Sequence, residues 1–379
     1  MSAQDELTRR RFLAGAAAVA GSAALGVGCG DDDAGAQPDA ALDAGRPAAD
    51  AAGPPALVGI AHRDDVEQAV RRAIELAGGI DEIGPGKTVF IKPNVVWPGP
   101  QPSRPAITTS TAVLQAVVKI VKERSPQRVI VGDRSARGFD SAATFDASGL
   151  RAAALAGGAD EVYAAPTPAA APGDWVLLQP PQYQEMWETD GGILAMRKLV
   201  EADYLINVPV LKDHRWAVFS LSMKNFIGAI GDSSRGGLHA ELGGDPGPLG
   251  RGIAILNQMF HPLMSVLDGW DALISGGPDG GVIFPDGAWT TPRLIMASRD
   301  RIALDAAGVS LLKLELSRTT LASTDQAHRH LVAAVGPWSL PQIVHGIERG
   351  LGVRGPEGAR LELDSVADAA EISRIFASR

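Results

Sequence analysis

The sequence predicts an α/β protein whose mixed, largely parallel sheet is flanked by helices. Short apolar runs alternate with amphipathic helical patterns after residue 55, which is the arrangement that joins parallel strands through crossover helices. The run at 88–91, for example, precedes a helical pattern at 110–123, and a new apolar run follows at 128–131. Residues 56–379 are numerous enough for one large domain or for two intimate lobes.

The first half of this region contains regular elements with recognisable boundaries. Asp64 is expected to cap the first helix, and valines recur on one face of the second. The expected elements are the strands 57–60, 88–91, 128–131 and 161–163 and the helices 65–77, 110–123 and 141–156.

The second half is less regular. The expected strands are 204–208, 263–267 and 294–297, and the expected helices are 252–259 and 305–314. Between them, residues 231–250 are rich in glycine and hold few large apolar side chains. A loop of that length in a compact domain is usually functional, so this segment is expected to be a mobile lid over a ligand.

The N-terminus has the features of an export signal. Residues 8–13, TRRRFL, resemble a twin-arginine motif, and the Ala/Gly run that follows is too short and too weakly apolar for a membrane span. Residues 1–28 are therefore expected to be a signal peptide. Because this route carries chains that have already folded, the protein is expected to fold in the cytoplasm and to function in the periplasm.

Cys29 is the only cysteine of the chain. Small residues precede it as in a lipobox, so a lipidated Cys29 would anchor the protein to a membrane, while a plain cleavage site near an unmodified cysteine is the alternative. Residues 29–55 hold almost no large apolar side chain and are expected to be a flexible tether. One cysteine excludes an internal disulfide and an iron–sulfur cluster ligated by this chain alone; any other cofactor is unknown.

The charge distribution limits which kinds of binding partner are expected. The formal net charge is −9, and no basic cluster occurs in the body of the chain. Nucleic acid is therefore not expected as a partner.

Polar side chains are expected where two strands end. Lys92 and Asn94 follow the apolar run at 88–91, and Asp133 follows the run at 128–131. Ligands of open α/β sheets collect at the carboxyl ends of the strands, so Lys92 and Asn94 are candidate ligand-binding residues. Asp133 would orient a lysine or act as a base. The alternatives are a solvated lysine, a turn asparagine and a capping aspartate.

The segment VPVLKDHRWAVFSLSMKNFIGAIGD, residues 208–232, sets donors among apolar residues. If the chain stays extended, Lys212 and His214 share a face. Lys224 and Asn225 follow, and a lysine in such surroundings either snorkels to water or lies near an anion. We assign candidate catalytic roles to His214 and Lys224 and ligand-binding roles to Lys212, Asn225 and, in the glycine-rich segment, His239.

Asp268 is the third candidate catalytic residue. It lies in LDGW at the expected end of a strand, placed to pair with a lysine, and the later Gly276–Pro278 turn would let backbone amides approach a ligand. A plain tight turn is the alternative. No metal site is predicted, because the spacing of His214, His239, Asp213 and Asp232 does not demand an ion.

The segments IKPNVV, VGDRS, NVPVLKDHRWAVFSLSMKNFIGAIGD, LDGWDALISGGPDGG and ASRDRIALDAAG together resemble the domain-of-unknown-function family DUF362. The resemblance directs attention to the candidates above and to Asp305. Some members of that family are fused to ferredoxin-type cluster modules, whose cysteines this chain lacks. The resemblance therefore implies that any redox chemistry would need an external partner.

Two functions remain open on these observations. In the first, the chain is an exported enzyme that holds a small carboxylate or phosphate by Lys92, Lys212 and Lys224, with His214 as acid or base, or with a lysine of depressed pKa as base. In the second, it is a membrane-tethered solute-binding or accessory protein that uses the same residues without turnover.

Overall fold

The computed structural model describes residues 54–98, 105–187, 191–239, 246–278, 287–321 and 326–379. The predicted signal peptide, the tether up to residue 53 and Cys29 lie outside these ranges. Residues from Pro55 to Arg379 form one compact unit. Among the described residues, no helix combines the length and the apolar character that crossing a membrane requires.

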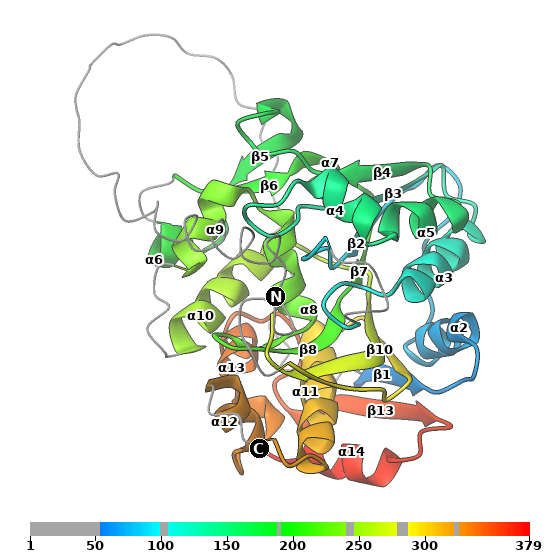
Figure 1. Ribbon diagram of the computed structural model, residues 1–379, viewed down its shortest axis with the longest axis vertical. Coiled ribbons are helices and arrows are strands. Elements are labelled where there is room, and N and C mark those ends of the chain that lie inside the picture. Colours follow the sequence, from blue (N-terminus) through cyan, green and yellow to red (C-terminus); the bar gives the residue numbers. More distant parts are fainter. Residues whose placement is uncertain (1–53, 99–104, 188–190, 240–245, 279–286, 322–325) are drawn as a thin grey trace, which may run out of the picture. The chain divides into compact units, whose positions relative to one another are not determined.

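One mixed, largely parallel sheet of eleven strands organises the described residues, as the sequence predicts. Its main path runs β13-β1-β12-β10-β7-β2-β3-β4; β8 and β11 pair with β10, and β9 pairs with β8 (Figure 1). On this path β12 runs antiparallel to both neighbours, and the remaining pairs are parallel. The strands are β1 (Ala56–Ala61), β2 (Thr88–Pro93), β3 (Arg128–Asp133), β4 (Glu161–Ala164), β7 (Tyr204–Val208), β8 (Val210–His214), β9 (Val218–Ser220), β10 (Met264–Ser275), β11 (Ala288–Thr290), β12 (Leu294–Ser298) and β13 (Ala359–Asp364), with a separate hairpin of β5 (Trp175–Leu178) and β6 (Ile193–Met196).

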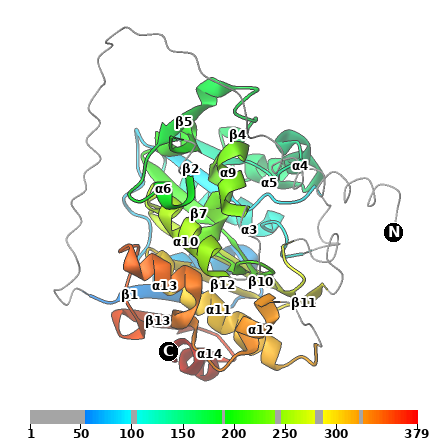
Figure 2. The same cartoon turned by 90° about the vertical axis from the view of Figure 1, so that its left-hand side faces the viewer.

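Helices cover both faces of the sheet (Figure 1), and Figure 2 shows α11 and α13 together on the second face. On the first face lie α2 (Val66–Leu76), α3 (Thr111–Lys122), α4 (Ser141–Ala147) and α5 (Leu150–Ala156). The others are α6 (Gln184–Trp187), α7 (Arg197–Val200), α8 (Ser222–Asn225), α9 (Asp232–His239), α10 (Pro246–Asn257), α11 (Arg301–Ser317), α12 (Gln326–Val332), α13 (Pro341–Glu348) and α14 (Ala369–Phe376).

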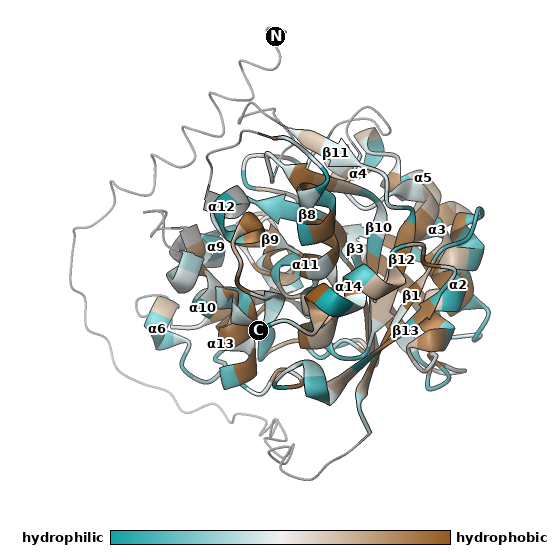
Figure 3. Ribbon diagram, turned by 90° about the horizontal axis from the view of Figure 1, so that it is seen from below, coloured by the Kyte–Doolittle hydropathy of each residue, from teal (hydrophilic) through white to brown (hydrophobic). Residues whose placement is uncertain are grey.

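The alternation of side chains along each strand divides the core into two layers. Val89 and Ile91 of β2 pack with α2, α3 and α5, whereas Phe90 packs in the layer that contains α10 and α11. Figure 3 shows α2, which carries both hydrophilic and hydrophobic colouring, beside β1 and β12. By the same alternation, Lys92 belongs to the layer of Phe90, on the side of α8.

Helix starts follow the capping chemistry of the sequence. Ser110, expected as the first residue of the second helix, caps α3, and Asp65, not the expected Asp64, accepts the first amide hydrogen bond of α2. Asp300 caps α11, which therefore begins four residues before the expected position 305.

Three further expectations about the elements are wrong. The helix expected at 141–156 is two helices, because Gly149 adopts a positive φ of 77° between them. The segment 231–250 contains α9 and the start of α10 where a loop was expected. The strand expected at 263–267 continues to Ser275, since β8, β11 and β12 all offer partners to β10.

Candidate functional site

The candidate residues gather at the carboxyl ends of β2 and β3 and along β8, which continues beyond β7 after Pro209. Two short helical turns, α8 and the 3-10 helix Phe226–Ala229, lie against these strand ends. This edge of a largely parallel sheet is where ligands of α/β proteins bind.

Lys92 and Asp133 form a buried ion pair. The Lys92 Nζ lies 2.7 Å from the Asp133 Oδ1 and also donates to the carbonyl of Pro93 at 3.1 Å. The Lys92 side chain is fully buried and that of Asp133 is 4% exposed. Burial lowers the pKa of the Lys92 ammonium, and the Asp133 carboxylate opposes that effect. The two charges therefore neutralise each other.

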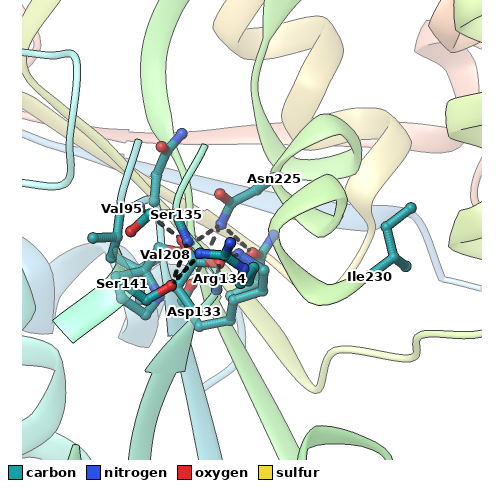
Figure 4. Close-up of polar contacts among 12 residues, drawn as sticks. Val95, Asp133, Arg134, Ser135, Ser141, Val208, Asn225 and Ile230 are labelled. Atoms are coloured by element: carbon teal, nitrogen blue, oxygen red, sulfur yellow. Dashed lines mark hydrogen bonds and ion pairs between the residues drawn. The ribbon is translucent and has the colours of Figure 1, made fainter. Parts of the chain in front are cut away.

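Asp133 also organises the backbone around it. Its Oδ2 accepts from the amide of Val95 at 2.7 Å, and its Oδ1 accepts from the amide of Arg134 at 2.9 Å (Figure 4). Gly228 packs directly on the pair: a Cβ there would lie 2.1 Å from the Asp133 Oδ1 and 2.7 Å from the Lys92 Nζ. Asp133 therefore orients a lysine, one of the two roles expected for it. Gly228 leaves room for this ion pair, a role that was not predicted from the sequence. The only sequence signal for it is the glycine in the segment NFIG.

Asn225 joins α8 to the strand ends. Its Nδ2 donates to the Asn207 Oδ1 at 2.8 Å and to the Lys92 carbonyl at 3.3 Å. Asn94 follows two residues after Lys92, and its backbone N–H donates to the Thr109 Oγ1 at 2.8 Å. The Asn94 Oδ1 is buried without a hydrogen-bond partner among the described residues. Asn225 thus fixes α8 to the strand ends, while the side-chain oxygen of Asn94 can still accept a hydrogen bond.

Lys212 and His214 lie on β8, which confirms that the chain stays extended there. Lys212 is buried and donates to the Ile107 carbonyl at 2.7 Å. The buried His214 accepts at Nδ1 from the amides of Trp216 and Ala217, at 3.3 and 3.2 Å. An Nδ1 that accepts leaves the proton of the neutral ring on Nε2.

Lys224 differs from the other two lysines. Lys92 is 0% and Lys212 1% exposed, and each donates a short hydrogen bond, whereas Lys224 is 9% exposed and forms no hydrogen bond or ion pair with another described residue. Burial, together with the charges of Lys212 and Arg235, lowers the pKa of the Lys224 ammonium to about 7. Near neutral pH this amine exchanges a proton readily.

Arg235 was expected in a mobile lid, and that expectation is wrong. It lies in α9, is 3% exposed, and donates to the carbonyls of Ile230, Ser135 and Arg134 at 3.0, 2.6 and 2.8 Å. The Arg134–Asp232 ion pair at 2.8 Å holds the same helix against the end of β3. Arg235 therefore supplies a fixed positive charge near Lys224. His239 is the last residue of α9, and its side chain lies outside the described part.

Asp268 pairs with no lysine among the described residues, and it does not end a strand. Its Oδ2 accepts from the Ser110 amide at 2.7 Å and its Oδ1 from the Trp270 amide at 3.2 Å, so it binds the start of α3. Burial raises the pKa of Asp268 to about 6. The Asp268-Gly269 pair, expected at the end of a strand, lies inside β10, where β12 pairs with both residues. The geometry assigns Asp268 a structural role.

Asp305 holds the helix that carries Lys224. It is fully buried, and its two carboxyl oxygens accept from the amides of Ser222 and Met223, at 2.6 and 3.1 Å. Burial raises the pKa of Asp305 to about 7.

The Gly276–Pro278 turn forms a hydrogen bond with the Asp213 side chain. The Gly277 amide donates to the Asp213 Oδ1 at 2.8 Å, and not toward a ligand as expected. Among the described residues, no three His, Cys, Asp or Glu side chains gather as a metal site would require.

Comparison with known proteins identifies relatives. The family model described as a domain of unknown function, DUF362, matches residues 89–310. A thylakoid-associated protein of Synechocystis sp. is 26% identical over 300 residues, which cover 74% of this chain and 85% of that protein.

Two solved structures are more distant. The lactate racemase apoprotein from Thermoanaerobacterium thermosaccharolyticum matches with a TM-score of 0.38 and 15% identity, over 61% of this chain and 53% of that chain. A protein from Thermotoga maritima matches with a TM-score of 0.34 and 15% identity, over 53% of this chain and 49% of its own. The chain thus spans about half the length of each, and at these scores neither bears on its chemistry.

Proposed function

The chain belongs to the domain-of-unknown-function family DUF362, and from that premise we propose that it is an enzyme acting on a small anionic ligand, a carboxylate or phosphate, bound beside Lys224. The observation that carries the proposal is the buried Lys224 side chain, which has no hydrogen-bond or ion-pair partner among the described residues. A buried cation without a counter-ion is unfavourable unless it loses its proton or gains an anion.

The surroundings of Lys224 favour an anion. Lys212 and Arg235 are both buried and close enough for their charges to depress the pKa of Lys224. Lys92 adds no net charge, because Asp133 neutralises it. An anion between these cations would restore the ammonium form of Lys224 and would offset the repulsion among the three positive charges.

The same arrangement suits proton transfer. An amine whose pKa lies near 7 is a competent base at neutral pH, and the Nε2 of His214 on β8 is a second candidate acid or base. We further propose that the protein is exported by the twin-arginine route and tethered to a membrane through Cys29. A tethered protein that binds its solute without turnover is the alternative.

Replacing Lys224 with methionine is expected to weaken sulfate binding about tenfold or more, because it removes the charge and keeps an unbranched side chain only one atom shorter. The measurement is isothermal titration with sulfate at pH 6. Lys313→Met is the matched control, since Lys313 is also partly buried but donates to the Leu331 and Ala333 carbonyls at 2.6 and 2.9 Å. Unchanged sulfate affinity in Lys224→Met would refute the anion site.

Sulfate affinity is also expected to fall as the pH rises from 6 to 8. Sulfate stays a dianion over that range, whereas Lys224 loses its proton as the pH passes about 7. The bound state prefers the protonated amine, so the affinity falls by about tenfold per pH unit at most above that pKa. The slope should disappear in Lys224→Met; a slope that persists there and disappears in His214→Gln would assign it to the histidine instead.

Turnover distinguishes the enzyme from the binding protein. Once a ligand of the anionic class is identified, His214→Gln is expected to abolish its conversion and to leave its affinity within about threefold of the parent value. A parent protein that binds the ligand and returns it unchanged would support the binding alternative.

A further inference from the structure

A cavity lies away from the Lys224 site, near the C-terminal end of α11. It has a volume of about 410 Å³ and lies between the connection from β11 to β12, the last turn of α11 and the start of α14. Helices α11 and α14 pack together there (Figure 1). Asp305, which holds α8, and Glu315, which lines the cavity, are about 15 Å apart along the axis of α11. The cavity is therefore separate from the Lys224 site, and its volume is in the range of small-molecule sites.

One wall of the cavity is apolar. Leu311 of α11 is 1% exposed and Leu294, the first residue of β12, is 6% exposed, and both line the cavity. Thr291 also lines it but is exposed, so it lies on the side that opens to solvent. A wall of this kind favours the hydrocarbon part of a ligand.

Three charged side chains line the cavity, and two of them are acidic. The guanidinium of Arg318 donates to both carboxyl oxygens of Asp368, at 3.0 and 2.5 Å. The Glu315 Oε1 lies 3.5 Å from the Arg318 Nη1, and the Glu315 carboxylate forms no hydrogen bond with another described residue. One guanidinium thus faces two carboxylates, which leaves one negative charge in excess.

The surroundings of Glu315 favour a cation that donates hydrogen bonds. Glu315 is only 9% exposed. A carboxylate that is nearly buried is normally hydrogen-bonded, because its desolvation is otherwise not compensated. Glu315 also lies in the last turn of α11, where the partial negative charge of the helix terminus disfavours a carboxylate and favours a positive charge.

The groups that line the cavity select the class of ligand. A divalent metal ion prefers more oxygen ligands than two carboxylates supply, and no three acidic, His or Cys side chains gather in the part of the chain that the structure describes. An anion would have to displace Asp368 from Arg318. An ammonium group, in contrast, brings one positive charge and three N–H donors.

We propose that this cavity binds a primary amine that carries an apolar group. The ammonium donates to the Glu315 carboxylate, and the hydrocarbon part lies against Leu294 and Leu311. This site adds a ligand to the proposed function and does not depend on it.

The test is a ligand-observed NMR titration of the protein with 2-phenylethylamine at pH 7.5, with 2-phenylethanol as the uncharged ligand of the same shape. We expect the amine to bind with a Kd of about 1 mM or tighter and the alcohol to bind at least about tenfold more weakly. Glu315→Gln should weaken binding of the amine at least about tenfold. Glu161→Gln is the matched control, because it removes the same charge from β4, where Glu161 pairs with Arg128 and Lys198, and it should bind the amine as the parent protein does.

A second variant tests the cavity without changing its charge. Thr291→Trp places a large side chain at the exposed edge and should also weaken binding of the amine at least about tenfold, while sulfate affinity stays at the parent value. Thermal unfolding shows whether each variant is folded, and Thr291→Trp together with the alcohol decides the question if Glu315→Gln is not.

Three results would overturn the inference. The first is an amine that does not bind, and the second is equal affinity for the amine and the alcohol, which would show an apolar cavity that does not recognise charge. The third is amine affinity that stays at the parent value in folded Glu315→Gln, whether or not Thr291→Trp weakens it.

Discussion

Replacing Asp133 with asparagine is expected to lower the free energy of unfolding by about 3 to 5 kcal/mol, one of the two largest effects that we predict. The substitution keeps the shape of the side chain but removes the charge that faces the fully buried Lys92 at 2.7 Å. Lys92 has no route to water from that position, so it must stay charged without a counter-ion or lose its proton. Either outcome destabilises the native state.

Urea denaturation measures this loss, and the chain contains a matched control. Asp160 also accepts from a lysine and from a strand amide, at 3.0 Å from Lys122 and 2.7 Å from Val129, but that pair is 31% and 40% exposed. Asp160→Asn is expected to lower the unfolding free energy by about 1 kcal/mol or less. Equal losses at the two sites would contradict the buried-pair argument.

The double variant Lys92→Met with Asp133→Asn separates the lost charge from the lost shape. Removing both charges abolishes the uncompensated ammonium, so the double variant is expected to be more stable than Asp133→Asn alone. If it is less stable than either single variant, packing of the two side chains dominates their electrostatics.

The strand ends of the site could be predicted because their signals are local. The apolar runs before Lys92 and Asp133 and the extended chain through Lys212 follow from period and composition, and parallel pairing then brings Lys92 and Asp133 to the same edge. Pattern alone does not tell which acid faces which lysine. Asp133 and Asp268 both follow apolar runs, yet it is Asp133 that pairs with Lys92, whereas Asp268 accepts from the Ser110 amide at the start of α3.

The segment after residue 231 could not be predicted for a different reason. Its glycines disfavour a helix by propensity, and the observed α9 depends on contacts with residues far away in the sequence. Arg235 reaches the carbonyls of Arg134 and Ser135, about a hundred positions earlier, and Arg134 reaches Asp232. Such tertiary hydrogen bonds outweigh a local preference of about 1 kcal/mol per glycine.

The position of the Lys224 charge depends on how α8 is held in place. This helix is only four residues long, so it does not persist by its own hydrogen bonds. Asp305 binds its first two amides, and Asn225 binds its last turn to β2 and β7. The position of Lys224 is therefore set by the contacts that Asp305 and Asn225 make on either side of it.

Replacing Asp305 with alanine is expected to lower the unfolding free energy by about 3 kcal/mol or more, because two buried amides lose their acceptor and a fully buried carboxyl leaves a void. It is also expected to weaken sulfate binding, since α8 then no longer holds Lys224 in place. The measurements are urea denaturation and sulfate titration of the folded variant at pH 6.

Asp300→Ala provides the control for this effect, because Asp300 is the partly buried N-cap of the same helix, accepts from the amides of Ile302, Ala303 and Val353, and has no hydrogen bond to α8 among the described residues. It should destabilise the fold but leave sulfate affinity unchanged, and equal weakening in both variants would contradict a role for Asp305 in positioning Lys224.

The pH dependence of stability provides a second test of Asp305. The pKa of Asp305 is raised to about 7 in the folded state, so its contribution to stability is complete below about pH 4 and is lost as the pH rises through 7. Asp305→Ala should remove that part of the decline in stability between pH 4 and 7, because it removes the buried carboxyl that must release its proton.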